Sequence, residues 1–272
     1  MSETVVLAVV SDLHTNSTIG LCPPYVELDD GGHYRSSKAQ RWLWRNWKAY
    51  VDKVKETAER ENGRIITVFN GDLNDGDHHD TPQIISRNEA TQLKIAVEAT
   101  KPLVELSDKV FVVRGTEVHV GKSGSMEETL AADIEAEKNP DTDMFSWWHL
   151  KLVAAGVSLD IAHHASMGRL PWTRPSSATK LAAVTMFEYM NRNEKPPDLV
   201  IRSHQHRWSD SWDAYRTRAI QLPAWQLATA YVHRLNPGAL ADVGGLIIVC
   251  RDGQYTVEKC AYTPTPAKAV KA

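Results

Sequence analysis

The chain has 272 residues, of which 42% are hydrophobic and 24% are charged, as in ordinary globular proteins. This length can bury a substantial core as one large domain or two small ones. A net charge of −3 gives the whole molecule no attraction to nucleic acid or to an anionic membrane, so a nucleic-acid partner would need a local basic groove. Eleven histidines and nine tryptophans are the counts that stand out.

The cysteines and the first apolar run indicate a reducing, cytoplasmic setting with no membrane partner. Three cysteines without a CxxC pair form neither a disulfide framework nor a thiolate zinc site. Cys250 and Cys260 flank a two-residue hairpin signal. In that register Cys250 faces Tyr255, and Cys260 lies too far along the ladder to bridge. The run at 5–10 is too short for a secretory signal or a membrane span.

Apolar runs alternate with helical patterns over most of the chain. The runs at 5–10, 65–69 and 110–113 are almost continuous and rich in β-branched residues, which predicts strands that are buried on both faces. Later strands are expected in a hairpin at 148–153 and 157–162, at 199–201, and antiparallel at 211–215, 219–222, 246–250 and 255–260.

Helices are predicted between these strands. The first begins after Ser37, a candidate N-cap, and extends to a stop at Gly63. The others cover roughly 87–106, with Pro102 inside, and 177–193. Strand–helix–strand units followed by hairpins favour an α/β fold of two stacked mixed β-sheets flanked by helices. No linker divides the chain, so we expect one domain over residues 1–263 and a flexible tail over 264–272.

Tryptophans and basic residues alternate near the start of the first helix, at Arg41, Trp42, Trp44, Arg45, Trp47 and Lys48. Aromatic rings bind bases and basic groups bind phosphates, so such a stripe can serve as a nucleic-acid surface. Helical spacing nevertheless places Leu43 and Trp47 on the core face. Packing in the core is therefore the favoured interpretation.

Five short motifs rich in histidine and aspartate each follow a strand-like run. They are Asp12-Leu-His14, Gly71-Asp72-Leu-Asn74-Asp75, Arg114-Gly115-Thr116-Glu117-Val-His119, His163-His164 and Ser203-His204-Gln-His206. In open α/β sheets, ligands gather outside the carboxyl ends of the strands. The side chains of the five motifs can therefore converge although they are far apart in the sequence.

The residue types in these motifs suit a binuclear metal centre. Two divalent cations ~3.5–4 Å apart can clamp a phosphoryl group and activate a water near neutral pH. A carboxylate that bridges both ions offsets their repulsion, and imidazoles with further carboxylates complete sites for borderline ions. We expect two divalent metal ions, manganese in the first place, with iron, zinc or nickel as alternatives.

The motifs resemble, in order, the signature of the calcineurin-like metallophosphoesterase family: D-x-H, G-D-x-x-D, G-N-H-D/E, H and G-H-x-H. The resemblance spans residues 12–206. It implies a first metal held by Asp12, His14, Asp72 and His206. It also implies that Asp72 bridges to a second metal held by His163 and His204. His163 is preferred to His164 because it directly ends the strand, where the family has its single histidine.

The third motif departs from the family pattern. Where the family has an asparagine ligand followed by a histidine near the leaving group, this chain has Thr116 and Glu117, and the histidine comes two positions late, at His119. Glu117 is the expected replacement ligand of the second metal, with Thr116 and His119 as alternatives. His119 is the expected catalytic group at the leaving oxygen, if the loop bulges. Asp75, the second aspartate of G-D-x-x-D, is expected to orient neighbouring groups of the catalytic site.

The remaining histidines are given other roles. His78 and His79 lie in a polar loop after the second motif, where we expect a solvated loop or pocket rim rather than a third metal site. His33, His149 and His233 are expected to be structural.

Together these features predict an enzyme that hydrolyses phosphate ester bonds through a two-metal-activated water. A phosphodiesterase or nuclease is favoured, because the SDLH and paired-histidine motifs resemble the DNA-repair nuclease branch of the family. The alternative is a phosphomonoesterase that acts on nucleotides, small phosphates or phosphoproteins. The acidic net charge favours this alternative, because it argues against a nuclease. The altered third motif suggests a non-enzyme alternative, a catalytically degenerate metal-binding module. The sequence leaves the substrate and the oligomeric state open.

Overall fold

Strand β1 (Thr4–Val10) lies between two hydrophobic cores, and its side chains alternate between them. One core receives Val6, Ala8 and Val10, and the other receives Val5, Leu7 and Val9. Successive side chains of a strand point to opposite faces, so a sheet covered on both sides needs the continuous apolar run seen here. The computed structural model describes all residues except 1–2, 79–80, 166–172, 239, 267 and 271–272.

The strands form two main sheets. The first has the order β13-β12-β1-β4-β5-β6, with β4 at Arg64–Asn70, β5 at Lys109–Val113, β6 at Ser146–Trp147, β12 at Val243–Arg251 and β13 at Gln254–Tyr262. The second has the order β10-β11-β9-β8-β7, with β7 at Leu150–Ala154, β8 at Val157–Ile161, β9 at Leu199–Arg202, β10 at Ser209–Asp210 and β11 at Arg218–Gln221. In both sheets the central strands are parallel and the β12–β13 and β7–β8 hairpins are antiparallel.

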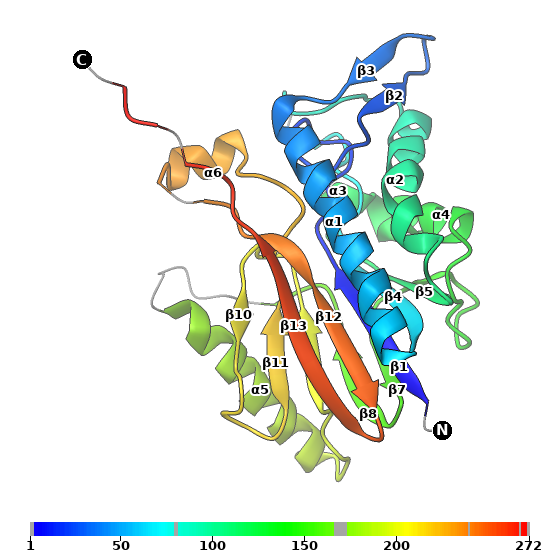
Figure 1. Ribbon diagram of the computed structural model, residues 1–272, viewed down its shortest axis with the longest axis vertical. Helices are drawn as coiled ribbons and strands as arrows, with labels where there is room; N and C mark the ends of the chain where they lie inside the picture. Colours follow the sequence, from blue (N-terminus) through cyan, green and yellow to red (C-terminus); the bar gives the residue numbers. More distant parts are fainter. Residues whose placement is uncertain (1–2, 79–80, 166–172, 239, 267, 271–272) are drawn as a thin grey trace.

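The two sheets stack face to face and helices cover their outer faces (Figure 1). The outer face of the first sheet is covered by α1 (Lys38–Glu61), α2 (Glu89–Val104) and α4 (Ser125–Asp133). The second sheet is covered by α5 (Arg174–Asn191), which packs Ala178 and Ala182 against Val200 and Ala219. The predicted α/β fold of two stacked mixed sheets flanked by helices is confirmed. Within the described residues, every helix is too short or too polar to cross a membrane.

Helix α1 begins where the sequence predicts. The Ser37 hydroxyl accepts a hydrogen bond from the Gln40 amide, and the Gln40 side chain accepts one from the Ser37 amide, which forms a capping box. The helix ends at Glu61, and its C-cap is Asn62 in the left-handed conformation, directly before the expected stop at Gly63. Leu43 and Trp47 are fully buried in the core as predicted.

Other local predictions need correction or extension. The hairpin register that pairs Cys250 with Tyr255 is confirmed. The strand expected at 211–215 is wrong, because the Trp212 amide donates to the Asp210 carboxylate and turns the chain after two residues of β10. Strand β11 pairs antiparallel with β10, as expected, but it is parallel to β9, because the chain returns to the level of Leu199 before Arg218 starts β11. Not predicted were β2 (Tyr25–Glu27), β3 (His33–Arg35), α3 (Glu117–Val120), a 3-10 turn at Lys122–Gly124, α4, β6 and α6 (Ala230–Leu235).

An aromatic cluster at the centre of the first core gives a stability test. The Trp47 ring meets the Trp225 ring edge-on at 4.9 Å between centroids and stacks on Tyr50. We expect Trp47→Ala to lower the free energy of unfolding by ~3–5 kcal/mol, since it deletes a fully buried aromatic side chain. Urea unfolding followed by circular dichroism would measure this loss.

The matched control is Trp148→Ala. Trp148 is 63% exposed, and its ring contacts the Arg114 guanidinium, so its loss should cost less than ~1 kcal/mol. Equal losses for the two variants would contradict the placement of Trp47 in the core.

Candidate metal centre

The five motifs meet at the carboxyl ends of β1, β4, β5, β8 and β9. Backbone hydrogen bonds join neighbouring loops directly: the Asp12 amide donates to the Gly71 carbonyl at 2.9 Å, and the His14 amide donates to the Asp72 carbonyl at 3.1 Å. The Ser203 amide donates to the His163 carbonyl at 2.7 Å. The first motif is therefore bonded to the second and the fourth to the fifth, and the five loops lie in one region.

Most of the predicted ligands adopt a backbone conformation that side chains usually avoid. The φ angles of Asp12, His14, Asp72, His204 and His206 lie between 44° and 72°. Non-glycine residues are uncommon in this left-handed region, and strained backbone of this kind is concentrated at functional sites. Here the turn just after each strand directs the polar side chain into the space between the loops.

Two glycines are required by the close approach of the loops. A Cβ atom on Gly71 would lie 2.4 Å from the His163 Nδ1, and one on Gly115 would lie 2.2 Å from the Asp72 amide nitrogen and carboxylate. Either contact is too short for any side chain. Glycine at these positions therefore lets the Asp72 carboxylate and the His163 ring lie against neighbouring backbone.

The first group of candidate ligands is Asp12, His14 and His206. The His206 Nε2 lies 3.1 Å from the Asp12 Oδ1 and 3.2 Å from the His14 Nε2. Two imidazole nitrogens this close cannot both carry a proton. Either one N–H donates to the other nitrogen, or both nitrogens offer lone pairs to a cation. Ligand atoms bound to one ion at ~2.1 Å are ~3.0–3.4 Å from each other, so these spacings fit a metal ion.

The second group is centred on Asp72 and His163. The His163 Nε2 lies 3.0 Å from the Asp72 Oδ2, while its Nδ1 donates to the Asn70 carbonyl at 2.6 Å. This bond fixes the ring and leaves Nε2 as the ligand atom. Asp72 also belongs to ligand clusters with Asp12 and with His14. Its carboxylate therefore lies between the two groups, where a bridging ligand is expected.

Opposite charges compensate each other in the buried centre. Burial acts against ionisation, but His206 and His163 lower the pKa of the Asp12 carboxyl, and His163 and His204 hold the pKa of Asp72 well below its usual value. Burial likewise disfavours the charged imidazole, but the Asp72 and Asp12 carboxylates outweigh it and raise the pKa of His163 to about 10. A metal ion held by His163 would take the place of the proton on this imidazole, so binding would release protons.

The third motif is arranged differently from the expectation. Thr116, not Glu117, faces the second group: its Oγ1 donates to the Asp72 Oδ2 at 3.0 Å and lies 3.0 Å from the His204 Nδ1. Glu117 is the first residue of α3, is exposed, and belongs to no ligand cluster among the described residues. The expected role of Glu117 as a metal ligand is therefore corrected, because the start of a helix turns its side chain outward.

His119 reaches the centre through this short helix rather than through a bulged loop. The His119 amide donates to the Thr116 carbonyl within α3, and its ring meets the His14 ring edge-on at 4.7 Å between centroids. The single turn of α3 brings the His119 ring to the centre, although this histidine comes two positions later in the sequence than in the signature. His119 thus lies beside the first group.

Asp75 is surrounded by imidazoles. Its Oδ1 lies 2.9 Å from the His119 Nδ1, 2.9 Å from the His78 Nε2 and 3.2 Å from the His14 Nδ1. Burial would raise the pKa of this carboxyl, but the bonds with His119, His14 and His78 hold it well below its usual range. Asp75 therefore fixes the orientation of three rings, one of them a candidate metal ligand.

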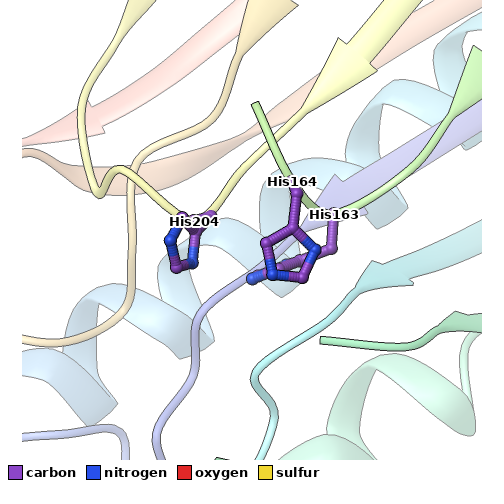
Figure 2. Close-up of side chains that lie close together, drawn as sticks. All are labelled: His163, His164 and His204. Carbon is purple, nitrogen blue, oxygen red and sulfur yellow. The ribbon is translucent and has the colours of Figure 1, made fainter. Parts of the chain in front are cut away.

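The other histidines divide into two sets. His164 lies beside His163 and His204 (Figure 2), with its ring centroid 4.9 Å and 4.8 Å from theirs. His78 lines the cavity beside the centre and also forms a cluster of possible ligands with Asp75 and His119, and His79 is outside the described residues. His33, His149 and His233 belong to no ligand cluster in the described part of the chain.

Sequence reasoning missed Glu127, a fully buried carboxyl on α4. It accepts hydrogen bonds from the Leu73 amide at 3.1 Å and the Gly115 amide at 2.6 Å, so it ties the second motif to the third. Burial, with the nearby Asp72 charge, raises the pKa of Glu127 to about 7. A glutamate in a helix carries no sequence signal for such a role, because only the tertiary fold brings it to the two loops.

Comparison with known proteins finds similarity in structure only. No family model matches the sequence, and no curated protein matches it. Similar solved structures include a dimetal phosphatase from Danio rerio, with 9% identity over 94% of this chain and 95% of that one and a TM-score of 0.49. Another is the sulfate thiohydrolase SoxB from Thermus thermophilus, with 13% identity over 94% of this chain and 56% of that one and a TM-score of 0.44. Vps29 from Chaetomium thermophilum has 11% identity over 96% of this chain and 100% of that one, with a TM-score of 0.41.

Neighbouring glutamates on α4 give a test of how the centre is held. Glu127→Ala should speed amide hydrogen exchange at Leu73 and Gly115 about tenfold or more, since an unmade buried hydrogen bond costs ~1–3 kcal/mol. The matched control is Glu128→Ala, which removes the acceptor of the Phe145 amide instead. It should speed exchange at Phe145 and leave Leu73 and Gly115 unchanged. Loss of protection at the same amides in both variants would mean only that α4 is destabilised.

Proposed function

We propose that this protein is a metal-dependent phosphoesterase with a binuclear centre. The observation that carries the proposal is the position of the Asp72 carboxylate between two ligand groups, one with Asp12, His14 and His206 and the other with His163 and His204. A carboxylate shared by two neighbouring groups is what two cations ~4 Å apart require. When bound, the ions would supply Lewis-acid stabilisation of phosphoryl charge and lower the pKa of water.

The residues around the ligands support hydrolysis rather than storage of metal. Asp75 holds the Nδ1 of His119 at 2.9 Å, which leaves Nε2 as the nitrogen that exchanges a proton with a substrate. This pairing of a carboxylate with an imidazole orients the ring and fixes its tautomer. His119 would donate the proton that the leaving oxygen requires when the ester bond breaks.

A cavity of about 890 Å³ opens beside the first ligand group and provides a place for a substrate. Its walls include His14, His119 and His206 on the metal side, and Arg207, Tyr231 and Arg234 farther out. This volume lies within the range of small-molecule sites, so it suits a phosphate ester the size of one or two nucleotides. Arg234 adds positive charge to the lining of the cavity, whereas the Arg207 guanidinium lies 3.6 Å from the Asp242 carboxylate, which offsets its charge.

We expect phosphodiesters to be cleaved at least as well as monoesters. The diester preference rests on the sequence resemblance, whereas the cavity size is compatible with either ester. Metal-depleted protein, supplied in turn with Mn²⁺, Fe²⁺, Zn²⁺ or Ni²⁺, would be assayed with a chromogenic monoester, a chromogenic diester, single-stranded DNA and double-stranded DNA. Turnover of monoesters alone would favour the phosphatase alternative. Two bound ions with no turnover of any substrate would favour the degenerate module.

His119→Ala tests the catalytic part of the proposal. It should lower kcat by ~10²–10⁴, the contribution of a general acid, while metal content by mass spectrometry stays at the wild-type level. Glu117→Ala is the control within the same motif. Its side chain is exposed, and the variant should keep both metal content and kcat. If His119→Ala removes a metal ion, His119 is a ligand rather than the acid.

A further inference from the structure

The second ligand group contains one more imidazole than the family signature provides. His163 and His164 are consecutive, yet both belong to a cluster with His204 whose ligand atoms all lie within 4.8 Å of each other (Figure 2). Consecutive side chains in a strand point to opposite faces. Here β8 ends at Ile161, so the chain beyond it is free to turn both rings toward His204.

The segment that carries His164 is held by the neighbouring strand end. The Ala162 amide donates to the Ile201 carbonyl at 3.2 Å, and the Ser203 amide donates to the His163 carbonyl at 2.7 Å. The Gln205 side chain then donates to the Ala165 carbonyl at 3.1 Å. These bonds on both sides of His164 fix the backbone from which its side chain extends, although the side chain itself is exposed.

Distances around Thr116 give the geometry of the group. The Thr116 Oγ1 lies 3.0 Å from the Asp72 Oδ2 and 3.0 Å from the His204 Nδ1. It lies 3.4 Å from the Nε2 of His163 and 3.4 Å from that of His164. Neighbouring ligands of one ion with ~2.1 Å bonds are ~3.0–3.4 Å apart. The Nε2 atoms of His163 and His164 thus lie at the same distance from the Thr116 hydroxyl, and the His164 Nε2 has the spacing expected of a ligand atom.

We propose that His164 is itself a ligand of the second metal, which is therefore held by three imidazoles, from His163, His164 and His204, and the bridging Asp72. This inference rests on the proposed binuclear function and specifies one of its two sites. Thr116 replaces the asparagine of the signature, and a neutral hydroxyl is a weaker donor than an amide oxygen. His164 supplies the strong donor that this substitution removes.

The consequence is a centre with two chemically different sites. The first group has two imidazoles, from His14 and His206, and the Asp12 carboxylate in addition to the shared Asp72. Imidazole-rich sites suit Zn²⁺, Fe²⁺, Co²⁺ and Ni²⁺, whereas carboxylates suit Mn²⁺ and Mg²⁺. The second site should accordingly prefer one of the borderline ions.

The test is a metal titration of the full chain after chelation. Wild type should bind two Zn²⁺ ions by calorimetry, and two Co²⁺ ions by visible absorption. His164→Ala should bind the first ion normally and the second ~10–100-fold more weakly or not at all, since even an outer partner of a ligand contributes that much. The visible spectrum of the second Co²⁺ ion should change as well. His33→Ala, which removes an imidazole remote from the ligand clusters, should match wild type throughout.

The possible results separate this inference from the function on which it rests. If wild type binds fewer than two ions, the binuclear function itself is overturned. If wild type binds two ions and His164→Ala binds both with unchanged affinity and spectrum, His164 is not a ligand and only this inference fails. His164→Leu, measured beside the alanine variant, guards against misfolding, because leucine has nearly the bulk of histidine but no donor atom. A weakened second site in a His164→Leu protein with wild-type circular dichroism supports the inference, and retained affinity in that protein overturns it.

Discussion

The metal centre depends on the bond between the two sheets at Asn70, the last residue of β4. Its side-chain amide donates to the Ala162 carbonyl at 3.1 Å and to the Ser203 hydroxyl at 2.6 Å, both at strand ends of the other sheet. Its carbonyl accepts from the His163 ring. Asp12 and Asp72 come from the first sheet, and the histidines from 163 to 206 come from the second. The two halves of the candidate site meet across this junction, which acts together with the apolar core between the sheets, and inside a protein such hydrogen bonds are strong.

At this junction the chain departs from the signature that it resembles, because Ser203 stands where G-H-x-H has glycine. The buried Ser203 hydroxyl accepts the hydrogen bond from the Asn70 side-chain amide. A serine at this position thus forms a polar link between the two sheets, whereas a glycine would allow a wider range of backbone conformations. Several candidate ligands nearby have a left-handed backbone, which is unfavourable for residues other than glycine. Buried carboxylates destabilise the fold further. The burial of apolar side chains must offset both effects, and β1 contributes to it on both of its faces.

The sequence predicted the parts of the structure that follow from local pattern. Continuous β-branched runs predicted the buried strands, Ser37 predicted the start of α1, and the order of strand ends predicted the meeting of Asp12, Asp72 and His163. It did not predict the role of Glu127, because a glutamate in a helix has no signal of its own. It also favoured Glu117 over Thr116 as the side chain that faces the second group, because the single turn of α3 that decides between them cannot be read from the sequence. The parallel pairing of β11 depends on the path of the chain outside the strands, which hydrophobic pattern does not encode.

The end of the sandwich opposite the metal centre contains a second junction. The β7–β8 and β12–β13 hairpins belong to different sheets, and the Gly253 amide of one turn donates to the Ala155 carbonyl of the other at 2.8 Å. Both turns have two successive residues with positive φ, as tight hairpins require. Because hydrogen bonds join the two sheets at both ends, they oppose sliding of one sheet relative to the other. The distances between candidate ligands that come from different sheets therefore depend on contacts at both ends of the sandwich, and an insertion in either distant turn should change these distances.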